Sequence, residues 1–154
     1  MSVSVDIVRE VRIDAPPEHV FPFFTDPDKM IVWKAVKATL DPRPGGTFRI
    51  DVTGHDVARG EYVEIDPPRR VVFTFGWEAE GSPEPPGSTT VEVTLVPDGG
   101  GTLLRLVHSG VPDEMRQGSS GGWDHYLLRL TVAAERGDPG PDPWADTAND
   151  GRSS

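Results

Sequence analysis

The sequence contains no cysteine, which excludes disulfide bonds, thiolate metal sites and a cysteine nucleophile. Positive charge is also scarce, since 15 lysines and arginines stand against 25 aspartates and glutamates and give a formal net charge of −10 at pH 7. A surface of that sign repels phosphate backbones, so no nucleic-acid partner is expected. Long apolar runs are absent as well, and none reaches the roughly 20 residues that a membrane span requires.

Residues 1–6 lack the basic region and the apolar core of a secretory signal peptide. Together with the missing cysteines and membrane spans, this predicts a soluble, cytoplasmic protein. The 154 residues suit one domain, which at this length buries about 68–70% of the surface that its unfolded chain exposes.

The spacing of apolar residues predicts the order of helices and strands. Alternation over residues 5–13 indicates a first strand. A helix is expected from Asp14, and Pro22 should keep it short or bent, because a proline beyond the first turn removes a hydrogen bond. A second short helix is expected after Asp26. From Val36 the period of two predicts about six antiparallel strands, including segments 48–53, 60–65, 71–77, 91–95 and 102–108.

Residues 121–136 predict the last element, a long helix that ends near Gly137. Its apolar residues fall at helical spacing and form one stripe, namely Trp123, Tyr126, Leu127, Leu130 and Ala134. The glycine- and serine-rich residues 117–122 are expected to be a loose approach to this helix. Residues 137–154, rich in proline, glycine and aspartate, predict a disordered tail outside a single domain of residues 1–136.

This order of elements predicts an α+β fold with an antiparallel sheet of about seven strands. Such a sheet is solvated on one face and covered by helix on the other. A single long helix covers a curved sheet incompletely, so the space between them can form a ligand chamber.

The chain resembles the SRPBCC, or START-like, superfamily. Within it the closest group is related to the C-terminal domain of the heat-shock-protein-90 ATPase activator and includes CalC-like proteins. The matching segments occur in the family's order: IDAPPEHVF at 13–21, FTDP at 24–27 with Trp33 after it, GGTF at 45–48, GEYVEIDPP at 60–68, VVFTF at 71–75, GTLLRLVHSG at 101–110 and GW at 122–123. The resemblance implies a helix-grip fold, in which a curved antiparallel sheet wraps around the long C-terminal helix.

The resemblance implies several functions. Members bind lipids, sterols, polyketides or other apolar molecules between the sheet and the long helix. Some are aromatases or cyclases, one is a self-sacrificing antibiotic-resistance protein, and the activator itself is a co-chaperone. A chaperone partner is not expected here, because the activator's further N-terminal domain has no counterpart in this sequence. A homodimer is compatible with the sequence.

Aromatic residues are the main candidates for the wall of the chamber, with core filling as the alternative for each of them. Phe73, Phe75 and Trp77 share one strand face, and Trp123 heads the covering helix, so these four are the strongest candidates. The full set of predicted ligand-binding residues is Trp33, Phe48, Phe73, Phe75, Trp77, His108, Trp123 and Tyr126.

Catalytic candidates are fewer. His108 ends the last strand beside the start of the helical segment, where it can reach the chamber mouth. His125 lies off the apolar stripe and is expected to be solvated. Tyr62 and Tyr126 complete the catalytic set with His108. No pair of histidines has metal-ligand spacing, so neither a metal ion nor a cofactor is expected.

Three functions follow, in order of preference. The first is binding or carriage of a small hydrophobic, lipid-like, polyketide-like or aromatic molecule. The second is an aromatase-, cyclase- or hydrolase-like enzyme, which requires at least two of the polar candidates to converge on the chamber. The third is a chaperone-interacting protein, which requires a contiguous exposed apolar patch.

Overall fold

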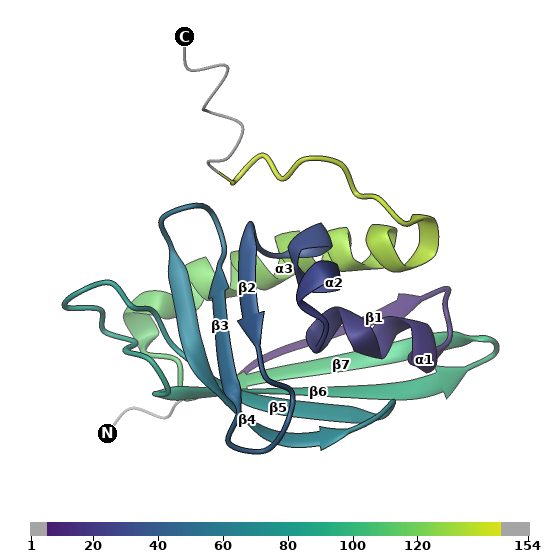
Figure 1. The fold of residues 1–154 in the computed structure, drawn as a ribbon, viewed down its shortest axis with the longest axis horizontal. Helices are drawn as coiled ribbons and strands as arrows, with labels where there is room; N and C mark the ends of the chain where they lie inside the picture. Colours follow the sequence, from purple (N-terminus) through teal and green to yellow (C-terminus); the bar gives the residue numbers. More distant parts are fainter. Residues whose placement is uncertain (1–5, 146–154) are drawn as a thin grey trace, which may run out of the picture.

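Seven strands form one antiparallel sheet in residues 6–145, the part of the chain that the computed structural model describes (Figure 1). They are β1 Ile7–Ile13, β2 Lys37–Leu40, β3 Thr47–Asp51, β4 Val57–Asp66, β5 Arg70–Phe75, β6 Thr89–Asp98 and β7 Gly101–Ser109. Their order across the sheet is β1-β7-β6-β5-β4-β3-β2. The predicted α+β class is confirmed, with two short α-helices after β1 and a long C-terminal helix.

The helical region after β1 is short and broken, as its prolines predict. Helix α1 covers Pro17–Val20, a 3-10 turn η1 covers Phe21–Phe24, and α2 covers Pro27–Trp33. Pro22 stands in the first turn of η1, where its missing N–H costs no hydrogen bond. The carboxylate of Asp26 accepts a hydrogen bond of 2.9 Å from the Asp28 N–H and thereby caps α2.

The helices cover one face of the sheet, and the strands alternate between that face and solvent (Figure 1). The buried face carries Phe48, Ile50, Tyr62, Phe73, Phe75, Val91, Val93, Leu104 and Leu106. The register shifts between Tyr62 and Glu64, and Val63 is 53% exposed whereas Tyr62 is 1% exposed. This irregularity bends β4 and helps the sheet to curve around the core.

Helix α3 spans Asp113–Arg136, so the prediction that it begins near residue 121 is wrong. Local propensity disfavours a helix through the glycines of this region. Tertiary packing overrides that preference, because Met115 and Trp123 contact the core on either side of them. The predicted apolar stripe is buried, and Gly137 ends the helix in a left-handed conformation with φ of 93°. No helix within residues 6–145 is long and apolar enough to cross a membrane.

Residues 138–145 turn back along α3 after Gly137 (Figure 1). We call this stretch the C-terminal segment. The Arg129 guanidinium donates a 3.0 Å hydrogen bond to the Gly140 carbonyl, and Ala145 is 7% exposed. This part of the expected disordered tail therefore contacts the domain. The rest of it, residues 146–154, lies outside the described residues.

Candidate functional site

A cavity of about 510 Å³ lies between the sheet and the first half of α3. We call it the chamber. The sheet contributes Phe75, Trp77 and His108, and the helix contributes Trp123 and Tyr126. The remaining lining residues are Lys34, Val52, Thr53, Asp56, Val57, Ala79, Ser82, Pro83, Glu114, Met115, Gly118, Ser119, Gly122 and Trp144. The sheet and the long helix thus meet around an open space, as the incomplete cover of one helix suggests.

Aromatic rings fix much of the chamber wall against one another. The Phe75 ring meets the Trp77 ring edge to face with centroids 5.3 Å apart, and its centroid lies 6.5 Å from that of Trp123. Gly118 and Gly122 line the chamber from α3, and a Cβ atom added to either would meet no atom within 4 Å. The glycines therefore keep open a space that larger side chains would fill.

His108 is buried in a hydrogen-bonded chain at the end of the chamber. Trp123 Nε1 donates to His108 Nδ1 over 3.0 Å, so the ring proton resides on Nε2. His108 Nε2 lies 2.8 Å from Thr89 Oγ1, which in turn donates to Glu84 Oε2 over 2.8 Å. Both nitrogens of the imidazole are thereby used within the protein. The geometry makes His108 a residue that orients the Trp123 indole.

The C-terminal segment covers the chamber beside Tyr126. Asp142 accepts hydrogen bonds from the Tyr126 hydroxyl over 2.7 Å and from His125 Nε2 over 2.8 Å. The Trp144 ring stacks on the His125 ring with centroids 3.8 Å apart. The expectation that His125 is a solvated helix residue is therefore wrong: its side chain is 18% exposed, because the C-terminal segment lies over this face of α3.

Electrostatics at this contact favour an ionised Asp142 and a neutral Tyr126. Burial raises the pKa of Asp142, but hydrogen bonds from the Trp144 N–H, Tyr126 and His125 outweigh it and hold that pKa below its ordinary value. Burial and the nearby Asp142 carboxylate both raise the pKa of the Tyr126 hydroxyl. Tyr126 therefore remains a proton donor to Asp142 at neutral pH.

Lys34 is the functional candidate that sequence reasoning missed. It is 7% exposed and follows α2, with its Nζ atom 4.5 Å from the Trp123 ring centroid and 4.4 Å from that of Tyr126. Burial lowers the pKa of its ammonium from 10.5 to about 7, against an opposing effect of Asp142. A buried lysine at a cavity of aromatic residues is a recurrent feature of functional sites.

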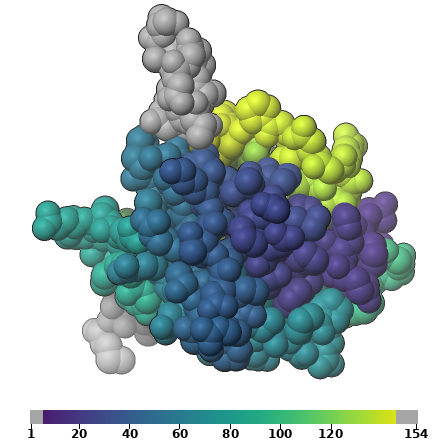
Figure 2. All heavy atoms as spheres, viewed as in Figure 1, coloured from purple at the N-terminus to yellow at the C-terminus, as the bar shows by residue number. Residues whose placement is uncertain are grey.

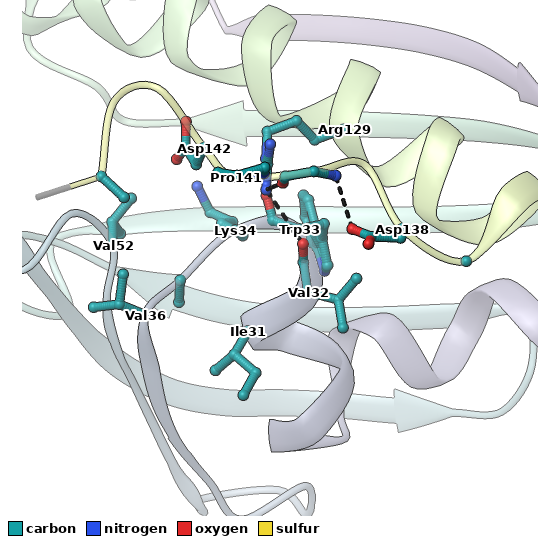
Figure 3. A pocket seen from close by; sticks show the side chains of 14 residues that line it. Ile31, Val32, Trp33, Lys34, Val36, Val52, Arg129, Asp138, Pro141 and Asp142 are labelled. Atoms are coloured by element: carbon teal, nitrogen blue, oxygen red, sulfur yellow. Dashed lines mark hydrogen bonds between the residues drawn. The ribbon is translucent and has the colours of Figure 1, made fainter. Parts of the chain in front are cut away.

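A second cavity, of about 640 Å³, adjoins the chamber at Lys34 and Val52 (Figure 3). We call it the side pocket. It lies between α2, the residues that join α2 to β2, and the C-terminal segment. Figure 3 shows Lys34 extending toward Asp142 there. Figure 2 shows this segment (yellow) beside the region of α2 (dark blue). Arg129 closes one side by donating to the carbonyl oxygens of Trp33 and Val32.

Residues 14–135 match the family model described as "Activator of Hsp90 ATPase homolog 1-like protein". The chain belongs to this family. The matched residues include every wall element of the chamber except the C-terminal segment. The predicted resemblance is therefore confirmed at the level of the family.

Solved structures of the family share this architecture. The AHSA1-like protein of Rhizobium etli is 47% identical, with a TM-score of 0.74, over 94% of this chain and 90% of that one. CalU16 of Micromonospora echinospora is 29% identical, with a TM-score of 0.71, over 86% of this chain and 78% of that one. The Aha1 dimer of Colwellia psychrerythraea, at 24% identity and a TM-score of 0.73 over 86% and 98% of the two chains, shows the fold alone.

A curated relative extends the family to a longer protein. An uncharacterised protein of Schizosaccharomyces pombe is 26% identical over 128 residues, which are 82% of this chain. The chain spans about a third of that relative's length, since the match covers 36% of it.

The residues predicted to bind ligand divide into two groups in this member of the family. Phe75, Trp77, His108, Trp123 and Tyr126 line the chamber. The other three, Trp33, Phe48 and Phe73, do not line the chamber.

Phe48 and Phe73 stack on each other in the core with centroids 4.2 Å apart and line neither cavity. Trp33 lines the side pocket and donates its indole N–H to the Phe23 carbonyl. Tyr62, a predicted catalytic residue, is also buried in the core, where its hydroxyl donates to the Phe24 carbonyl over 2.8 Å. Burial raises the pKa of that hydroxyl.

Proposed function

We propose that the chamber binds a small apolar molecule that carries an aromatic or other flat hydrocarbon group. The supporting observation is the cavity of about 510 Å³ with Phe75, Trp77 and Trp123 in its wall. Small-molecule sites have volumes of roughly 300–1,000 Å³ and are lined mainly by apolar and aromatic side chains. Fixed rings offer a flat contact area at little cost in side-chain entropy.

Titration of tryptophan fluorescence tests this proposal, because Trp77 and Trp123 both line the chamber. The titrants are a lipid, a sterol and a set of polyketide-like aromatic compounds. At least one class should give a saturable change in fluorescence together with an increase in melting temperature. A panel in which no compound does so contradicts the proposal.

A pair of α3 variants places the bound molecule. Gly118 lines the chamber, whereas Gly121 does not, and a Cβ atom at either position meets no atom within 4 Å. Gly118→Leu should fill part of the chamber and weaken binding by about tenfold or more, equivalent to roughly 1.4 kcal/mol. Gly121→Leu is the matched control and should bind like the unaltered protein. Equal affinities for both variants place the ligand outside the chamber.

The enzyme alternative receives less support from the geometry. It requires two polar candidates that face the chamber with atoms available to a substrate. His108 and Tyr126 line the chamber, but their polar atoms are engaged with Trp123, Thr89 and Asp142. Tyr62 is engaged with Phe24 in the core. Binding is therefore the function that we favour over catalysis by these residues.

The chaperone alternative also receives less support. The large apolar side chains that are exposed among the described residues are spread over β1, α2, β4, β6, β7, α3 and the C-terminal segment: Val8, Ile31, Val63, Val96, Leu103, Leu128 and Trp144. Val96 and Leu103 are cross-strand neighbours, but a docking surface for a protein partner needs a larger contiguous apolar patch than one such pair. A pull-down in which the chaperone is retained would restore this alternative.

A further inference from the structure

Lys34 differs from an ordinary buried lysine in forming no salt bridge within residues 6–145, although the Asp142 carboxylate attracts its ammonium at longer range. The residues that the structure describes form no salt bridge or hydrogen bond with its Nζ atom. Buried ammonium groups normally require such partners, because removal of an unpaired charge from water is costly. Lys34 instead has the faces of the Trp123 and Tyr126 rings within 4.5 Å and 4.4 Å of Nζ.

The position of Lys34 makes its amine accessible to a bound molecule. Its side chain lines both the chamber and the side pocket, so a ligand in either cavity can contact it. Access from bulk solvent is small, since the residue is 7% exposed. An amine in such a place is removed from water but remains within reach of a ligand.

The charged groups around Lys34 are unevenly distributed. Asp138, Asp142 and Arg129 line the side pocket, and Asp56, Glu114 and His108 line the chamber. Only Asp142 acts appreciably on the Lys34 ammonium, and its attraction is smaller than the effect of burial. With a pKa of about 7, a substantial fraction of Lys34 is the neutral, nucleophilic amine at neutral pH.

We propose that Lys34 forms an imine with an aldehyde or ketone group of an apolar ligand held in the chamber. This inference rests on the proposed binding function and specifies its ligand class. The neutral Nζ attacks the carbonyl carbon, a C–N bond forms, and one of the two amine protons passes to the oxygen to give a carbinolamine. The hydroxyl group then takes up a proton from solvent, the C–O bond breaks as the nitrogen lone pair forms the C=N bond, water leaves, and the iminium nitrogen returns its remaining proton to solvent to give the imine. No oxidant or reductant takes part, and hydrolysis by the same steps releases the ligand.

In the test, the full chain is incubated with aromatic and aliphatic aldehydes, or with the corresponding alcohols, in the presence of sodium cyanoborohydride as reductant. Reduction converts the imine into a stable secondary amine, which peptide mass spectrometry assigns to a residue. The chain has three lysines, so Lys29 and Lys37 serve as internal references. Lys34 should be labelled at least about tenfold faster than either at pH 7, because burial lowers the pKa of its ammonium to about 7. Its labelling should level off above neutral pH, as the last of the ammonium loses its proton.

Two variants of Lys34, together with the alcohols, distinguish failure of the imine proposal from failure of the proposed binding function. Lys34→Arg keeps a cation but cannot form an imine, so it should bind the alcohols and lose the specific adduct. Lys34→Met should behave in the same way without the charge. If the alcohols bind to the unaltered protein but the aldehydes label all three lysines equally, the proposal that Lys34 forms an imine is wrong. The proposed binding function is then still supported. Failure of both alcohols and aldehydes to bind overturns the binding function and the imine together.

Discussion

At the scale of single residues, Lys34 should make the stability of the folded protein increase with pH. Burial lowers the pKa of its ammonium to about 7 in the folded chain, whereas the unfolded chain keeps an ordinary value near 10.4. Between these values the unfolded chain binds more protons, so a rise in pH favours the folded state. From pH 7 to about pH 9, unaltered protein should gain about 2 kcal/mol more than Lys34→Met, as measured by urea denaturation.

Lys37→Met is the control for this prediction, because Lys37 is exposed on β2, three residues further along the chain. It should respond to pH like the unaltered protein. Measurements stop near pH 9 because of Tyr62 and Tyr126, whose pKa values burial raises in the folded chain. At higher pH the tyrosines of the unfolded chain ionise first, which lowers the free energy of unfolding and opposes the effect of Lys34. An identical response of the unaltered protein and Lys34→Met would contradict the assignment of the effect to Lys34.

His108 shows how far sequence reasoning can go for a single residue. Its place on the Leu104 and Leu106 face of a strand next to the helix was correctly predicted from alternation. Its chemical role was not, because the partners of its ring come from β6 and α3, at Thr89 and Trp123. Hydrogen bonds between side chains 15 and 19 residues apart leave no periodic pattern in the sequence.

At the scale of elements, the glycines of α3 should affect stability in opposite directions. Gly121 is exposed within the helix, and a Cβ atom there meets nothing within 4 Å. Gly121→Ala should therefore stabilise the protein by up to about 1 kcal/mol, the difference in helix propensity. Gly137 has φ of 93°, so Gly137→Ala should destabilise it by about 1 kcal/mol. Denaturation curves measure both effects, and shifts of the same sign would contradict the argument.

The start of α3 marks the limit of local reasoning about elements. Alternation and helical spacing were sufficient to predict the order of strands and helices, because each element buries one face. They missed the first two turns of α3, since residues 118–122 have a poor helix propensity. The helix forms there because Met115, which precedes these residues, packs against the core. Strands that are distant in sequence build that core.

At the scale of the whole molecule, Asp142 should hold the C-terminal segment on the domain. It accepts hydrogen bonds from His125, Tyr126 and the Trp144 N–H. Asp142→Ala removes all three, so limited proteolysis within residues 138–145 should become several-fold faster. Asp138→Ala is the matched control, because Asp138 accepts only the N–H of Gly140 within its own segment. Equal cleavage of the two variants would show that Asp142 does not anchor the segment.

The candidate site could be predicted only in part, because it forms between remote segments. Phe75 and Trp77 could be predicted from the apolar face of their strand segment, and Trp123 from the apolar stripe of the last helix, because the sheet and the helix bury these faces against each other. Lys34 could not be found in this way, since a lysine is ordinarily expected to extend to solvent even where its neighbours in sequence are apolar. It is buried because residues 129 and 138–145 approach the end of α2 from the other end of the chain. Composition alone predicts a disordered tail for residues 137–154, so it gives no reason to expect residues 138–145 beside Lys34.

Lys34 stands in the wall that the chamber and the side pocket share. Any charge or dipole that a molecule brings into either cavity therefore acts on the same ammonium. Two occupants would consequently sense each other without touching, and the free energy that couples them would be equal in both directions. One side chain thus makes the two cavities a single thermodynamic system.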